Sequence, residues 1–273
     1  MKKNNSSVFW WIFAIVFTLS IAYYQRTTGP TYPVKNKIQI NDDEVRFKLP
    51  RSNDSHIPAL ITINGVSNNI RGQIEYKKFK TNEEWKIVEL KSEGDKLSGE
   101  LPNQPPAGKL IYKITLFSDG EAYKLTDEPV VIRFKGAVPP YILWPHIIFM
   151  FMAMLFSSRT GIEAIRKGDK TFNYTFITII LLLFGGMILG PVVQKYAFGE
   201  FWTGWPFGKD LTDNKTLVAF VFWIVAWFRL RKNKNNRGWV IAASIILLMI
   251  YMIPHSMFGS ELDYSSGQVV TGK

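Results

Sequence analysis

The uneven spacing of apolar residues constrains this chain more than any other feature. They gather in five long runs, which cover residues 8–24, 141–156, 172–193, 217–228 and 238–254. A helix needs about 20 apolar residues to cross a bilayer, and most of these runs approach that length. A mostly polar stretch of more than a hundred residues separates the first run from the second. The pattern predicts an N-terminal transmembrane helix, a folded domain outside the bilayer, and then a membrane α-helical bundle of four transmembrane helices.

The net charge of +11 lies mostly beside these runs. Eleven basic and only two acidic residues occupy three short clusters, at residues 2–3, 159–170 and 229–237. Because lysine and arginine concentrate in cytoplasmic loops, the clusters predict five crossings, with the N-terminus in the cytoplasm and the C-terminus outside. We therefore expect a protein integral to the cell (inner) membrane and in contact with membrane lipid.

The polar stretch at residues 25–138 is nearly neutral, with 18 basic and 15 acidic residues. A nucleic-acid-binding domain concentrates positive charge on one face, and this stretch is predicted to be periplasmic or extracellular. Nucleic acid is therefore excluded as a partner. The chain has no cysteine, which removes disulfides and thiolate metal sites. The outer domain must be held together by its apolar core.

The first apolar run has two interpretations. A basic start, an apolar segment and the small residues Ser20 and Ala22 resemble a cleaved signal peptide. The run is also crowded with aromatic residues, and Tyr23 and Tyr24 at its outer end suit the interfacial belt of a retained helix. We favour a retained signal-anchor helix at residues 1–25. Either outcome leaves the polar domain outside.

Short alternating apolar segments fill residues 37–134. Val45, Phe47 and Leu49 alternate with polar residues, and later segments repeat this pattern between turns such as Asn64-Gly65. Alternation with period two indicates strands with one buried face. Seven or eight short strands in about 100 residues predict an all-β domain, a β-sandwich of the immunoglobulin or fibronectin type III kind, at residues 35–136. Because such folds commonly bind other proteins, we expect a protein partner in the cell envelope.

The segments that flank this domain are short and contain proline, at residues 28–33 and 138–140. Proline restricts the backbone, so little free linker is available. We expect the domain to be mounted stiffly over the four-helix bundle at residues 139–257. Residues 258–273 are expected to form a polar tail on the same side of the membrane.

Two histidines stand inside the apolar runs, His146 after Pro145 and His255 after Pro254. Ionisable residues within a bilayer are rare and often functional. At 1.5 Å per residue, His146 lies ~8 Å into its run. The predicted topology places both histidines at a similar depth near the outer rim. We favour a structural explanation, in which each side chain bonds backbone groups that a proline leaves unpaired.

One alternative is an electron-transfer subunit that holds one haem b, with His146 and His255 as axial ligands from facing helices. Gly186 and Gly190 would make room for the flat cofactor, although close helix packing explains this small-x-x-x-small pair more simply. The lysines near the propionates would be Lys195, Lys209 or Lys215.

A second alternative is a divalent metal at the outer rim, where an open coordination position would allow hydrolysis by activated water. Its ligands would be His146, His255, Glu200 and Asp210. No His-Glu-x-x-His or similar spacing supports such a site. Met252 and Met257 beside His255 permit a copper site, but methionine is common in apolar helices.

The loop at residues 195–214 is expected to lie at the outer interface. Asp213 is expected to N-cap the helix that follows, whereas Glu200 and Asp210 have no comparable structural role. No Ser-His-Asp set, phosphate-binding loop or dinucleotide fingerprint occurs. We therefore expect a non-enzymatic membrane protein that presents its β-sandwich to a partner or supports assembly of an envelope complex.

Overall fold

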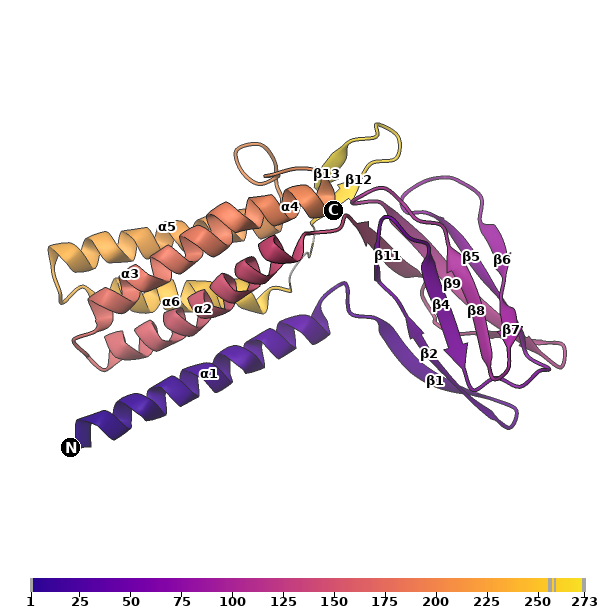
Figure 1. Ribbon diagram of the computed structural model, residues 1–273, viewed down its shortest axis with the longest axis horizontal. Helices are drawn as coiled ribbons and strands as arrows, with labels where there is room; N and C mark the ends of the chain where they lie inside the picture. Colours follow the sequence, from indigo (N-terminus) through magenta and orange to yellow (C-terminus); the bar gives the residue numbers. More distant parts are fainter. Residues whose placement is uncertain (1, 255–256, 258, 272–273) are drawn as a thin grey trace.

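The computed structural model describes residues 2–254, 257 and 259–271. A bundle of helices lies at one end of the molecule and a β-domain at the other (Figure 1). Helix α1 (Lys2–Thr28) leads into the β-domain, and the chain then returns to form the remaining helices. We call the end of the bundle beside the β-domain the domain end, and the opposite end the distal end.

The β-domain consists of two open sheets. The first sheet has the order β1 (Val34–Ile40), β2 (Asp43–Leu49), β4 (Ala59–Asn64), β8 (Lys96–Leu101) and β7 (Lys91–Glu93). The second has the order β3 (Ser52–Asp54), β11 (Val130–Lys135), β9 (Lys109–Ser118), β5 (Arg71–Lys78) and β6 (Lys86–Glu89), with β10 (Glu121–Lys124) beside β9. Every pair is antiparallel except β3 with β11.

The two sheets share one apolar core. Strand β9 alternates between buried and half-exposed residues, as the sequence pattern predicts for a strand with one buried face. Tyr112 at its centre is fully buried, and its hydroxyl donates to the carbonyl of Pro50 at 2.8 Å. The domain has more strands than expected because β3, β7 and β10 are edge segments of only three or four residues. The immunoglobulin or fibronectin type III topology stays a prediction.

Four helical segments of the described chain are long and apolar enough to cross a membrane. They are Ser7–Thr28, α2 (Pro140–Ile165), Thr171–Phe198 and α5 (Leu211–Lys232). Thr171–Phe198 consists of α3 (Thr171–Leu182), the π-helix η1 (Leu183–Leu189) and α4 (Gly190–Phe198). The protein is thus a candidate membrane protein with a β-domain.

Helix α6 (Arg237–Met252) is apolar but has only 16 residues. At 1.5 Å per residue it reaches ~24 Å, which is less than the ~30 Å core of a typical bilayer. It packs against α2 and α5. The predicted fifth crossing therefore stays a prediction.

Helix α1 packs on the bundle through a few specific contacts. Trp11 makes edge contacts with Phe156 of α2 and Tyr174 of α3 near the distal end. The guanidinium of Arg159 lies over both the Trp11 and Tyr174 rings and pairs with Glu163 at 2.7 Å. These contacts make α1 a part of the helical bundle in this structure.

Residues after α6 form a hairpin, β12 (Ser260–Leu262) and β13 (Val269–Thr271), at the junction of bundle and β-domain (Figure 1). The described part of the C-terminal segment is therefore folded against its neighbours, where the sequence suggested only a polar tail. Its contacts are described with the site below.

A second connection between the two parts lies just after β11. The N–H of Gly136 donates to the carbonyl of Ala197 in α4 at 2.9 Å. A side chain at position 136 would collide with the carbonyl oxygen of Tyr196. The backbone of the β-domain thus contacts α4 directly at Gly136, and stiff mounting of the domain stays a prediction.

Candidate functional site

A cavity of about 270 Å³ lies at the domain end of the bundle. Its polar lining consists of Gln25, His146, Gln194, Asp210, Thr212, Asp213, Lys215, Thr216, Tyr251 and Ser260. Its apolar lining includes Ile147, Met150, Phe151, Val193, Phe198, Trp202 and Ile250. Small-molecule sites typically have volumes of ~300–1,000 Å³ and combine apolar walls with a few placed polar groups. The cavity has this composition at the small end of the size range.

One wall depends on the loop between α4 and α5. Asp213 accepts the backbone N–H of Thr203 at 2.7 Å and lies 3.3 Å from the Thr203 hydroxyl. Asn214 accepts the N–H of Trp205 at 2.6 Å. The amide of Gln194 in α4 donates to the same Thr203 hydroxyl at 2.7 Å. The loop is therefore held on both sides, by α4 and by the first turn of α5.

Asp210 is the N-cap of α5, so the expectation that Asp213 has this role is wrong. Asp210 Oδ1 accepts the N–H groups of Thr212 at 2.7 Å and Asp213 at 3.4 Å. Its Oδ2 accepts the hydroxyl of Ser260 in β12 at 3.3 Å. Asp210 directly precedes the first helical residue, where a side-chain oxygen reaches these N–H groups, whereas Asp213 is one turn too far along.

Lys215 is the buried cation of the cavity. Only 8 % of the residue is exposed. Its ammonium donates to the carbonyl of Ile253 at 3.2 Å and, among the described residues, forms no ion pair within 4 Å. An ammonium has three N–H donors, so two of them have no partner in the described part of the chain.

His146 is held by the π-helix of the neighbouring segment. Its Nδ1 lies 2.9 Å from the carbonyl of Gly185, which also accepts the N–H of Gly190. A carbonyl can only accept, so Nδ1 carries the proton and Nε2 is left as an acceptor. His146 therefore bonds a backbone carbonyl, but this carbonyl already has a helical partner and is not one that a proline leaves unpaired. A π-helix at this point is notable because such turns frequently occur at functional sites.

The glycines of η1 and α4 have different surroundings. A Cβ on Gly185 would lie 2.8 Å from Cβ of Phe149, and one on Gly186 would lie 2.7 Å from Cγ2 of Thr216. These two glycines therefore allow close packing of η1 on α2 and α5. A Cβ on Gly190 would lie 3.9 Å from the His146 ring and 3.6 Å from a carbonyl, which are ordinary contacts. Gly190 thus borders open space.

The structure brings together six of the residues that the sequence singled out. The cavity is lined by His146, Gly186, Gly190, Asp210, Asp213 and Lys215. Glu200 is exposed and is not among the lining residues. His255 lies outside the described residues, so its relation to His146 stays a prediction. His56, the third histidine of the chain, is exposed in a loop of the β-domain.

Metal binding finds no support in the described part of the chain. No group of three or more His, Asp or Glu side chains there could hold a metal ion. Asp210 is occupied by the helix cap and by Ser260, which leaves it poorly placed to act as a ligand.

Several lining residues were not found from the sequence. Gln25, Gln194 and Ser260 meet at the cavity from segments that are far apart in the chain. Gln25 donates to the carbonyls of Tyr251 at 3.1 Å and Ile253 at 3.4 Å. In the sequence, Gln25 stands out as a polar residue at the end of an apolar run. This position does not indicate which helix Gln25 contacts.

The C-terminal hairpin closes the junction by binding the β-domain. Glu261 accepts from the ammonium groups of Lys80 and Lys109, each at 2.6 Å. The N–H of Leu262 donates to the carbonyl of Ala107 at 2.9 Å. The hydroxyl of Tyr264 accepts the N–H of Lys109 at 3.0 Å. We call this hairpin, residues 260–271, the clamp.

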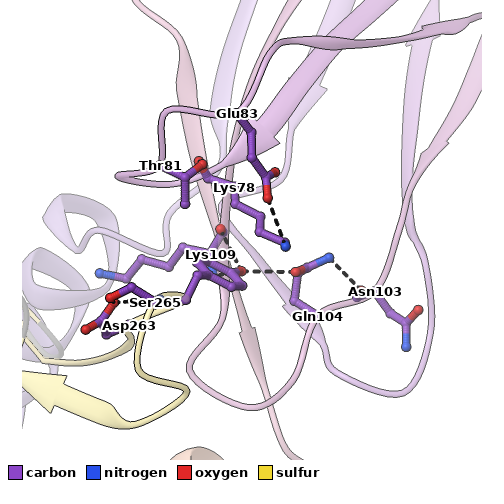
Figure 2. A network of polar contacts seen from close by, with 9 residues as sticks. Lys78, Thr81, Glu83, Asn103, Gln104, Lys109, Asp263 and Ser265 are labelled. Carbon is purple, nitrogen blue, oxygen red and sulfur yellow. Dashed lines mark hydrogen bonds and ion pairs between the residues drawn. The ribbon is translucent and has the colours of Figure 1, made fainter.

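The surroundings of the clamp are strongly charged. Figure 2 shows Lys78 paired with Glu83 beside Lys109, with Asp263 and Ser265 of the clamp close by. Burial alone raises the pKa of the Glu261 carboxyl, but hydrogen bonds from Lys109 and Lys80 outweigh burial and hold its pKa below the usual value. Burial lowers the pKa of Lys109, and Glu261 partly opposes this effect. The clamp therefore depends on an ionised Glu261.

The sequence matches no known protein-family model and no curated protein. The candidate site is therefore defined by its geometry alone.

Proposed function

We propose that this chain is an integral membrane protein that binds a small amphipathic molecule, taken from the bilayer, in the cavity at the domain end of the bundle. The observation that carries the proposal is Lys215, a buried ammonium that lines the cavity and has unused hydrogen-bond donors. Burying a charged group whose hydrogen-bond donors are not all satisfied is costly, so such a group is often retained where a ligand satisfies it.

The orientation of the protein follows from the charge clusters. The basic clusters at residues 2–3, 159–170 and 229–237 flank the distal ends of the helices (Figure 1). By the positive-inside rule, the distal end faces the cytoplasm and the β-domain lies in the periplasm or outside the cell. The exposed aromatic side chains of Phe201, Trp205 and Phe207 then lie at the outer membrane-water interface.

In this arrangement the clamp residue Ser260 lines the cavity on the aqueous side, and the β-domain adjoins the same end of the bundle (Figure 1). Gly136 joins the domain to α4, and the clamp joins it to the N-cap of α5 through Ser260. We also expect the β-sandwich to bind a protein partner or to support assembly of an envelope complex. That role stays a prediction and is separate from the proposed binding of a small molecule.

Filling the cavity tests the proposal. Gly190→Leu extends a side chain from a position that borders open space, whereas Gly238→Leu does so at the distal end, where nothing lies within 4 Å. Native mass spectrometry is expected to reveal a bound small molecule in the purified parent protein. The Gly238→Leu variant, in which Gly190 is unchanged, should keep this molecule. Gly190→Leu should lose it. A parent protein without any bound molecule, or an adduct that survives Gly190→Leu, would contradict the proposal.

The second candidate is one haem b held by His146 and His255. It is favoured by the Nδ1–H of His146, which is fixed by a backbone carbonyl as in many ligating histidines. The cavity volume of about 270 Å³ is small for a porphyrin, so we rank this candidate second. An absorption spectrum of the purified protein tests it: a Soret band that disappears in His146→Ala would support haem, and a colourless protein would exclude it.

A further inference from the structure

We infer that the molecule in the cavity has an uncharged headgroup with at least one hydroxyl group and further oxygen acceptors, attached to an apolar chain. This inference rests on the proposed function, because it specifies the chemistry of the same cavity. Acylglycerols and quinols both have this chemistry, and they are the two membrane sources considered in the test below.

The first requirement comes from Lys215. Its unused N–H donors need oxygen acceptors, and the described residues supply only the carbonyl of Ile253. A carbonyl, ester or hydroxyl oxygen on the ligand would meet this need. A hydrocarbon alone would leave the ammonium unsatisfied, at a considerable free-energy cost.

The second requirement comes from the two carboxylates in the lining. Asp210 accepts hydrogen bonds from two backbone N–H groups and from Ser260, and Asp213 accepts from Thr203. These hydrogen bonds already engage both carboxyl groups with the protein's own donors. At formal charges, Asp210, Asp213 and Lys215 sum to −1 in the lining, which disfavours an anionic headgroup. A cationic headgroup would compete with Lys215 and find no unoccupied carboxylate.

The third requirement comes from His146. Its Nδ1–H is bound to the Gly185 carbonyl, so Nε2 can only accept. Among the described residues Nε2 has no partner, and the side chain lines the cavity. A ligand hydroxyl would donate to this nitrogen. The site therefore offers an uncharged polar headgroup one acceptor, Nε2 of His146, and the unused N–H donors of Lys215.

The apolar lining indicates that the part of the ligand beyond the headgroup is an apolar chain. Ile147, Met150 and Phe151 of α2 line the cavity, and Phe151 is also 42 % exposed on the helix surface. The cavity thus reaches the flank of α2, which faces lipid in the proposed orientation. An acyl or isoprenoid chain can extend from the cavity into the lipid beside α2. A fully water-soluble ligand would not need such an opening.

The test compares four amphipathic probes, three of which share an eighteen-carbon chain, in native mass spectrometry titrations with the full chain. They are 1-oleoylglycerol, decylubiquinol, oleate and oleylamine. We expect at least one of the two uncharged probes to bind about tenfold more tightly than oleate or oleylamine. The tighter of the two uncharged probes identifies the source as acylglycerol or quinol.

Two variants locate the binding site. Lys215→Met should weaken binding of the uncharged probe by about tenfold, the usual effect of losing a hydrogen bond to a charged donor. His146→Phe should weaken it by a smaller factor. Lys232→Met, an exposed lysine at the distal end of the same helix, is the matched control and should bind like the parent.

The outcomes separate the two proposals. If oleate or oleylamine binds as tightly as the uncharged probes and Gly190→Leu abolishes this binding, the headgroup inference fails and the cavity function stands. If uncharged probes bind but neither Lys215→Met nor His146→Phe affects them, the inference also fails. If no probe and no co-purified molecule binds, the proposed function itself is overturned.

Discussion

Asp213 accepts the backbone N–H of Thr203 at 2.7 Å across a separation of ten residues in the chain. The bond joins the first turn of α5 to the loop that precedes it. Because Asp213 also lines the cavity, the same side chain anchors the loop and forms part of the cavity wall. This contact makes the local architecture of the candidate site testable by mutation.

Replacing Asp213 by alanine should release the loop. A lost hydrogen bond from a buried N–H typically costs ~1–3 kcal/mol, and the exposed amide should then exchange more rapidly. Hydrogen-exchange mass spectrometry over residues 199–210 measures this effect. Asp169→Ala, an exposed aspartate at the distal end, is the control and should leave exchange unchanged. Equal exchange in the parent and Asp213→Ala would show that other contacts hold the loop.

Replacing Asp210 by alanine should destabilise the start of α5 by ~0.5–2 kcal/mol, the usual effect of losing an N-cap. It also removes the acceptor of the Ser260 hydroxyl, so the clamp should loosen. Asp210→Asn keeps a capping oxygen and should recover most of the thermal stability. If Asp210→Asn were as unstable as Asp210→Ala, the capping role would be refuted.

The clamp should weaken in acid. The folded-state pKa of Glu261 lies below its usual value of 4.5. Its stabilising contribution is therefore fully present above the unfolded-state pKa and is lost as the pH falls below about 4.5 through the folded-state pKa. Limited proteolysis of residues 260–271 between pH 7 and pH 3.5 should reveal the release.

Glu261→Gln tests the source of this pH dependence. The variant should have a loosely bound clamp already at pH 7 and a flatter pH profile than the parent. Glu128→Gln, at an exposed position in the β-domain, should keep the parental profile. A parental profile in Glu261→Gln would assign the acid sensitivity to other groups.

Gly136→Ala should disturb the connection between β-domain and bundle. The added Cβ would collide with the backbone carbonyl of Tyr196, which cannot rotate away as a side chain can. Crowding of this kind costs ~1–3 kcal/mol. Thermal unfolding should begin at a lower temperature than in Gly238→Ala, where the added Cβ meets nothing within 4 Å. Identical unfolding curves would exclude a tight contact at Gly136.

Helix α1 should remain in the mature protein. Trp11 packs on α2 and α3 and lies beside the Arg159 guanidinium, so removal of residues 1–22 would uncover the Arg159–Glu163 pair. Intact mass measurement of protein from native membranes distinguishes the two cases. A mass lacking residues 1–22 would favour the signal-peptide interpretation.

The sequence alone determined the kinds of elements and their order. Runs of about 20 apolar residues indicate membrane helices, and alternation with period two indicates strands, because both patterns are local along the chain. The same local signals missed the short strands β3 and β7, which have too few residues to alternate, and the parallel pairing of β3 with β11.

Only the tertiary structure decided which polar residues share a site. The sequence drew attention to His146, but its bond to Gly185 joins residues 39 positions apart. Asp210, and not the expected Asp213, caps α5, because the register of one helical turn determines which carboxylate reaches the free N–H groups. Glu261 meets Lys109 across 152 residues. Such contacts depend on how separate elements pack, and neither periodicity nor composition encodes that packing.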